Sequence, residues 1–159
     1  MKVLENLLVS VLIICMLLSS CDKKGTDPKP ALKEILTASK WQLNRVFMEN
    51  PPGTGAIELT YTTFKSCELD DLFEFKADGS FTSDENGLPC IPVNNSIFFR
   101  LGGGSWSSSG DTSLRFQSGF LSHSYHIREF NKDWLDLTHI SENYVGEKEL
   151  YLYRFRAIH

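Results

Sequence analysis

Cys21 is the residue whose position points most directly to chemistry. It ends an apolar segment in which residues 7–18 are all apolar except Ser10, and the chain turns polar immediately after it. A run of this length is typical of the apolar region of a signal peptide, because a helix that crosses a bilayer needs about 20 such residues. The segment therefore predicts export from the cytoplasm.

The step Ser19-Ser20-Cys21 resembles the lipobox of bacterial lipoproteins. The resemblance implies cleavage before Cys21, attachment of diacylglycerol to its thiol, and fatty acylation, such as palmitate, of its new amino group. Two or more acyl chains hold a protein stably on a membrane, whereas one does so only marginally. The alternatives are an uncleaved N-terminal membrane helix and an ordinary secretory signal in which Cys21 has no role.

Three segments follow from this interpretation. Residues 1–20 form the signal peptide, residues 21–30 a lipidated tether rich in charges and proline, and residues 31–159 the folded domain. We expect a lipid-anchored protein of the bacterial cell envelope. Asp22 would retain it at the inner membrane under one bacterial sorting rule, but other bacterial groups sort differently, and we favour the outer membrane.

Cys67 and Cys90 are the two cysteines left for the domain, since Cys15 leaves with the signal peptide. An exported protein matures in an oxidising compartment, where such a pair forms a disulfide. The alternatives are two buried thiols or a redox pair, and the Cys-x-x-Cys spacing typical of redox pairs is absent. We predict a Cys67–Cys90 disulfide.

Other chemically capable residues do not form a convincing catalytic or metal site. His123 and His126 are three apart on an expected strand, so they face opposite sides and would share a zinc ion only at a bulge or turn. In each of two acidic pairs the residues are adjacent in sequence, so their side chains diverge on a strand or face water in a loop. A run of three glycines lacks the Lys of a phosphate-binding loop. The pairs are Asp70 with Asp71 and Asp84 with Glu85, and the run is Gly102-Gly103-Gly104. We expect no enzyme activity, no metal and no cofactor.

The amino-acid composition and charge limit the classes of molecule that the chain is expected to bind. The chain is 42% hydrophobic and 23% charged with a net charge of -4, and its 16 Lys and Arg are scattered. A hydrophobic fraction of this size predicts a packed core, and scattered basic residues do not make a nucleic-acid surface. We expect a monomer that contacts the membrane through its lipid and does not bind nucleic acid.

The pattern of apolar residues predicts one short helix followed by strands. Leu32, Ile35 and Leu36 have helical spacing within residues 31–38, and everything after Trp41 has the pattern of strands and turns. The expected strands are 41–48, 72–76, 80–82, 105–107, 113–117, 123–130, 134–140 and 147–156.

Alternation within these strands predicts two faces. Glu74, Arg115, His126, Arg128 and Asp136 are expected to face outward. The residues of the opposite parity are Phe73, Phe75, Leu114, Phe116, Tyr125, Ile127, Leu135 and Leu137, with Tyr151, Tyr153 and Phe155 on the last strand. About eight consecutive antiparallel strands can close and leave no open edge, so we predict an all-β, up-and-down barrel. A β-sandwich is the alternative, since periodicity does not show closure.

From about Leu36 to Phe155 the chain is similar to the lipocalin-like lipoprotein domains of Gram-negative bacteria. The similar pieces are Trp41-Gln42-Leu43, Cys67 before Asp70 and Asp71, the hairpin 73–81, Cys90, Gly104-Ser105-Trp106-Ser107, and the segments 114–116, 125–127 and 134–138. The resemblance implies an eight-stranded lipocalin-like barrel. The chain departs from the family in its Pro51–Gly55 insertion and its glycine run.

The barrel interior is the expected functional site. An eight-stranded barrel is either filled by its side chains or open for one small ligand, and inward aromatic rings suit a hydrophobic or aromatic molecule. The candidate lining residues are Trp41, Phe73, Phe75, Trp106, Tyr125, Leu135 and Tyr153. The alternative is a filled barrel that acts as a structural or interaction lipoprotein, an envelope complex subunit or inhibitor, without a ligand.

Overall fold

The computed structural model describes residues 31–84, 86–87 and 102–159 of the chain. The predicted signal peptide (1–20), the tether (21–30), Cys21, Glu85 and Cys90 lie outside the described residues. No helix in the described ranges is both long and apolar enough to span a bilayer.

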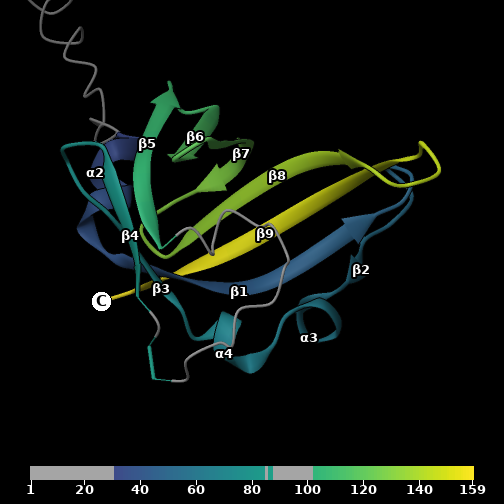
Figure 1. The fold of residues 1–159 in the computed structure, drawn as a ribbon, viewed down its shortest axis with the longest axis horizontal. Coiled ribbons are helices and arrows are strands. Elements are labelled where there is room, and N and C mark those ends of the chain that lie inside the picture. Colours follow the sequence, from purple (N-terminus) through teal and green to yellow (C-terminus); the bar gives the residue numbers. More distant parts are fainter. Residues whose placement is uncertain (1–30, 85, 88–101) are drawn as a thin grey trace, which may run out of the picture.

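The described residues form one antiparallel sheet that closes on itself (Figure 1). Its eight long strands follow one another in space as in sequence, and the last pairs with the first, so the up-and-down barrel is confirmed and the sandwich is not. Closure satisfies the backbone groups that an open sheet would leave at its edges. The strands are β1 (Lys40–Glu49), β3 (Leu72–Phe75), β4 (Ser80–Asp84), β5 (Gly103–Ser109), β6 (Ser113–Ser118), β7 (Leu121–Phe130), β8 (Trp134–Glu142) and β9 (Lys148–Ile158).

The segment between β1 and β3 differs from the prediction. It contains the two-residue strand β2 (Ile57–Glu58) and two one-turn helices, α3 (Thr60–Thr63) and α4 (Ser66–Leu69), where strands and turns alone were expected. A four-residue helix is too short to produce a helical apolar pattern, so periodicity could not reveal it. Tertiary contacts fix α3 instead, because the buried Thr60 hydroxyl oxygen accepts a hydrogen bond of 3.0 Å from the Val46 backbone N–H.

The helix α2 (Leu32–Ala38) closes one end of the barrel. Its buried residues are Leu32, Ile35 and Leu36, as their spacing predicted. The indole N–H of Trp41 donates a 3.0 Å hydrogen bond to the Leu36 carbonyl and so ties the end of the helix to the first strand. The turns β3–β4, β5–β6 and β7–β8 lie at this closed end, because β1 starts there and successive strands alternate in direction.

Strand alternation directs the expected side chains to the interior. Every residue assigned to the inner parity is buried except Tyr151, which is half-buried. Bulges in β1 after Leu43 and in β7 after Ile127 shift the inward parity, so Val46 and Phe130 also join the core.

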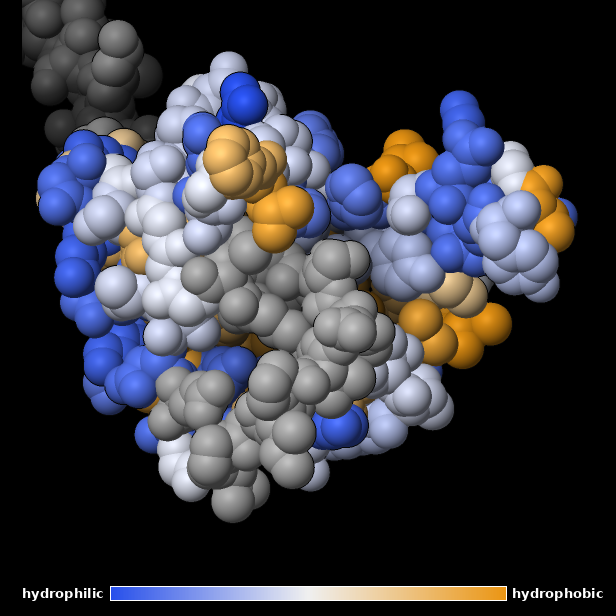
Figure 2. All heavy atoms as spheres, in the orientation of Figure 1, coloured by the Kyte–Doolittle hydropathy of each residue, from blue (hydrophilic) through white to orange (hydrophobic). Residues whose placement is uncertain are grey.

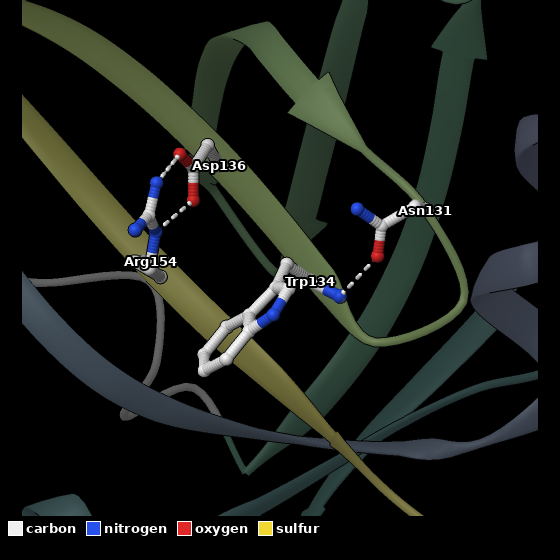
Figure 3. A network of polar contacts seen from close by, with 4 residues as sticks. All are labelled: Asn131, Trp134, Asp136 and Arg154. Atoms are coloured by element: carbon white, nitrogen blue, oxygen red, sulfur yellow. Dashed lines mark hydrogen bonds and ion pairs between the residues drawn. The ribbon is translucent and has the colours of Figure 1, made fainter.

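One outward residue, Asp136, is buried rather than solvated. It is only 3% exposed because Arg154, its register partner on β9, covers it and forms a two-point ion pair with it (Figure 3). The Arg154 guanidinium carbon also lies 5.8 Å from the ring centre of Trp134, whose backbone N–H donates to Asn131 Oδ1. The network therefore holds β8, β9 and the preceding turn together on the outer surface.

The glycine run has a steric role at the start of β5. A Cβ on Gly104 would lie 2.2 Å from the Gln117 carbonyl oxygen and 3.1 Å from the Phe81 ring. Only a residue without a side chain allows β5 to approach β6 so closely here. The run leads into β5, and packing against β6 requires a glycine at position 104.

Candidate ligand site at the open end of the barrel

All seven predicted lining residues point to the barrel interior and are buried. They lie on β1, β3, β5, β7, β8 and β9. Phe75 and Trp106 have ring centres 5.6 Å apart, and Tyr125 and Tyr153 5.9 Å apart, both pairs nearly edge to face. Their burial agrees with an inward position, and their role in ligand binding stays a prediction.

The rings form a continuous contact chain across part of the interior. Phe116 connects the pairs, since its ring centre lies 5.9 Å from both Phe75 and Tyr125 and 5.4 Å from Phe81. Edge-to-face contacts at these distances are favourable beyond simple burial. These side chains therefore act as core as well as wall, and the ligand site is better sought where the chain of rings reaches the surface.

That place is the end of the barrel opposite α2. The strands β1, β8 and β9 run well past the other strands on this side (Figure 1). Their inner face carries Met48, His139, Glu149 and Tyr151, which are all half-buried. Tyr151 pairs with Met48 on one side and with His139 on the other. Along these strands the inner face changes from buried aromatic rings to half-buried polar groups. The entrance of a ligand-binding site needs such a combination of apolar and polar groups.

Tyr151 is the central side chain of this mouth. Its ring stacks on that of Tyr153, with centres 6.2 Å apart and planes 15° from parallel. Its hydroxyl donates a 2.7 Å hydrogen bond to Glu149 Oε2. Burial, the hydrogen bond to Glu149 and the charge of Glu149 together raise the pKa of Tyr151 to about 12, so the phenol is a neutral hydrogen-bond donor at physiological pH.

Glu149 is held in place by amides from two turns. Its Oε1 accepts hydrogen bonds from Asn143 Nδ2 at 3.2 Å and from Asn50 Nδ2 at 3.3 Å. With the Tyr151 bond, the carboxylate has three neutral partners and no cation among the contacts of the described residues. The Glu149 carboxylate therefore places a negative charge beside the aromatic surface of the mouth.

His139 and Tyr125 form the opposite part of the mouth. Their ring centres are 5.5 Å apart, and His139 Nδ1 lies 3.3 Å from the Ser124 carbonyl oxygen, an arrangement that suits an Nδ1–H donor. Burial, with a smaller effect of Tyr153, raises the pKa of Tyr125 above its ordinary range. Burial acts in the same way on the pKa of Tyr153. All three tyrosines of the mouth are thus uncharged near neutral pH.

Sequence reasoning identified Tyr125 and Tyr153 but missed His139, Glu149 and Asn143 as members of one site. These residues are polar or lie near turns, and only the pairing of β8 with β9 places Glu149 opposite Ser141 and His139 opposite Tyr151. The alternation of the last strand contained a signal, since Glu149 and Tyr151 share its inner parity.

The other sequence candidates are separated or lie outside this site. His123 is half-buried on the inner face of β7 while His126 is exposed, as their spacing predicted. Within the described ranges, no three His, Cys, Asp or Glu side chains come together as metal ligands. Asp70 directly follows α4 and is half-buried, and Asp71 is buried between α4 and β3. Cys67 lies within α4, and its predicted partner Cys90 is not among the described residues.

Comparison with known proteins adds no assignment. Neither the models of known protein families nor the curated proteins include one that matches this chain.

Proposed function

We propose that this chain is a lipid-anchored, lipocalin-like protein of the bacterial cell envelope that binds a small aromatic or hydrophobic molecule at the open end of its barrel. The observation that carries the proposal is the stacked pair Tyr151–Tyr153 on the half-buried inner face of three protruding strands. Stacked rings offer a flat apolar surface, and the neutral Tyr151 hydroxyl beside Glu149 offers a polar contact at its edge.

The anchor part of the proposal rests on the lipobox-like step at Cys21. The fold is consistent with it in one respect: α2 starts at Leu32 and closes the end of the barrel opposite the mouth. A chain tethered through residues 21–30 would therefore join the barrel at its closed end and leave the mouth free for ligands. Outer-membrane localisation and a monomeric state belong to the same proposal.

Membrane anchoring has its own test. Growth with radiolabelled palmitate should label the wild-type protein and leave Cys21→Ser unlabelled, while Cys15→Ser remains labelled as the control. Fractionation of the two membranes then gives the location. Unlabelled wild-type protein of a mass that includes residues 1–20 would overturn the anchor.

The Cys67–Cys90 disulfide is proposed on the oxidising compartment that export implies. It would connect α4, beside β1, to the segment that lies between β4 and β5 in sequence. The closed loop would stabilise the fold by roughly 3 kcal/mol on the chain-entropy account.

A direct binding test uses the neutral aromatic probe N-phenyl-1-naphthylamine and its fluorescence. We expect saturable binding to the wild type and at least about tenfold weaker binding to Tyr151→Ala, because that change removes both the stacked ring and the hydroxyl. Tyr144→Ala is the matched control, since Tyr144 lies in the β8–β9 turn and its side chain is 99% exposed. Equal affinity of all three proteins would place the probe elsewhere and contradict the proposed mouth.

The alternative, a barrel without a ligand that acts through protein contacts, is favoured by two observations. The ring contacts around Phe116 fill part of the interior. The turns at the open end and the first residue of β7 also expose apolar side chains, namely Phe120, Tyr144 and Val145 in the turns and Leu121 on β7. In the view of Figure 2 the apolar surface is divided into separate small groups rather than one broad patch. Absence of saturable probe binding by a folded wild-type protein would favour this alternative.

A further inference from the structure

A polar pocket lies on the outer surface of the barrel, away from the mouth. Its volume is about 330 Å³, and it lies where β1 meets β9 on one side and the α3–α4 segment on the other. At about 30 Å³ for each water-sized group, it has room for about ten non-hydrogen atoms. The lining residues are Gln42, Leu43, Asn44, Tyr61, Ser66, Leu69, Asp70 and Arg156.

Arg156 supplies a positive charge that no carboxylate neutralises among the described residues. Its Nε and Nη2 both donate to the single amide oxygen of Gln42, at 3.0 and 2.6 Å. A guanidinium has five N–H donors, so three remain for another acceptor. The amide fixes the direction of the guanidinium without cancelling its charge, which is the arrangement that a carboxylate ligand needs.

Asp70 supplies a negative charge to the same pocket. Its Oδ1 is buried and has no hydrogen-bond partner within the described part of the chain. A buried acceptor without a hydrogen bond is unfavourable, and more so when it is charged. A ligand ammonium near this carboxylate would offset part of this unfavourable energy by its charge.

The strand register separates the two charges. Gln42 pairs with Arg156 of β9 on one side and with Leu72 of β3 on the other, and Asp70 comes two residues before Leu72. Neighbouring strands are about 4.8 Å apart, so the backbones of Arg156 and Leu72 are about 10 Å apart with Gln42 between them, and Asp70 lies beyond Leu72. A molecule that carries both charges can therefore lie between the two groups.

From this geometry we infer that the outer pocket binds a small zwitterion of the amino-acid class, with its carboxylate on Arg156 and its ammonium toward Asp70. Leu69 and the ring of Tyr61 provide an apolar surface for its side chain. The Asn44 and Ser66 side chains add neutral hydrogen-bonding groups. The site is independent of the proposed mouth, since the two share no residue.

The test measures binding of L-leucine, of L-leucinamide, which lacks the carboxylate, and of N-acetyl-L-leucine, which lacks the ammonium. Calorimetry on the wild-type protein should show saturable binding of L-leucine, with each derivative at least about tenfold weaker. Arg156→Gln should weaken L-leucine to the level of L-leucinamide, and Asp70→Asn to the level of N-acetyl-L-leucine.

Matched controls are Arg115→Gln and Asp111→Asn, which change exposed residues of the same types elsewhere. Both should retain wild-type affinity, as should Tyr151→Ala, whose defect belongs to the mouth. The inference is overturned if folded wild-type protein shows no saturable binding of L-leucine at millimolar concentration. It is equally overturned if Arg156→Gln and Asp70→Asn bind as tightly as the controls.

Discussion

The guanidinium of Arg154 forms two hydrogen bonds with the carboxylate of Asp136, from Nε to Oδ1 at 2.8 Å and from Nη2 to Oδ2 at 2.6 Å (Figure 3). Asp136 is buried, whereas the Arg154 side chain is 39% exposed. The hydrogen bonds to Asp136 raise the pKa of Arg154 and so favour its charged form. The pair links β8 to β9 from outside the barrel.

Removal of the cation should destabilise the fold because a buried carboxylate then loses its partner. We expect Arg154→Ala to lower the free energy of unfolding by about 2 kcal/mol, less than for a fully buried pair because water reaches Arg154. Urea denaturation measures the change. Arg115→Ala, at an exposed arginine that bonds Ser122, should stay within about 0.5 kcal/mol of wild type. Equal effects of the two changes would show that the Asp136 pair adds nothing specific.

Alkaline pH should destabilise the mouth through Tyr151. Its pKa is raised from 10.0 to about 12 in the folded protein, so the neutral phenol is favoured by folding. This contribution is complete below pH 10, falls as pH rises above it, and is lost beyond about pH 12. Spectrophotometric titration at 295 nm should show a step near pH 12 that is absent from Tyr151→Phe. An unchanged titration curve in that variant would refute the assignment.

Trp41 should be essential for holding α2 against the closed end of the barrel. Trp41→Phe removes the hydrogen bond to the Leu36 carbonyl and leaves space at a fully buried site. We expect a loss of about 2–3 kcal/mol in unfolding free energy and faster amide exchange throughout α2. Trp134→Phe is the matched control, because Trp134 is 40% exposed and its side chain belongs to the outer surface. Unchanged exchange in α2 would contradict the role of the indole as its attachment.

Gly104 should not tolerate even one methyl group. Its Cβ would meet the Gln117 carbonyl oxygen, a backbone atom that cannot rotate away. We expect Gly104→Ala to lower the free energy of unfolding by more than about 2 kcal/mol by forcing β5 away from β6. Ser107→Ala, at an exposed position of the same strand, should have almost no effect in the same urea titration. A stable Gly104→Ala protein with unchanged exchange in β5 would show that the strands can separate at little cost.

The proposed disulfide has a simple chemical readout. Protein isolated from the envelope should show no reactive thiol after denaturation without reductant, apart from any contributed by residues 1–20. Cys67→Ser should expose one thiol, that of Cys90, and lower stability by roughly 3 kcal/mol. Two reactive thiols in the denatured wild type would eliminate the bond.

Local sequence pattern determined most of the barrel wall. Period-two alternation placed Phe73, Phe116 and Leu137 in the interior, and helical spacing placed Leu32, Ile35 and Leu36 against it. These outcomes follow from burial along a single strand or helix, because the hydrophobic effect acts on each residue according to the face it occupies.

Tertiary structure decided everything that depends on residues far apart in the chain. The pairing of β1 with β9 closed the barrel and brought Gln42 beside Arg156 and Met48 beside Tyr151. The same long-range register buried Asp136 under Arg154 and aligned Glu149 and His139 on one mouth. No periodicity encodes such partners, since the period of a strand states which face a residue occupies and not which strand lies next to it.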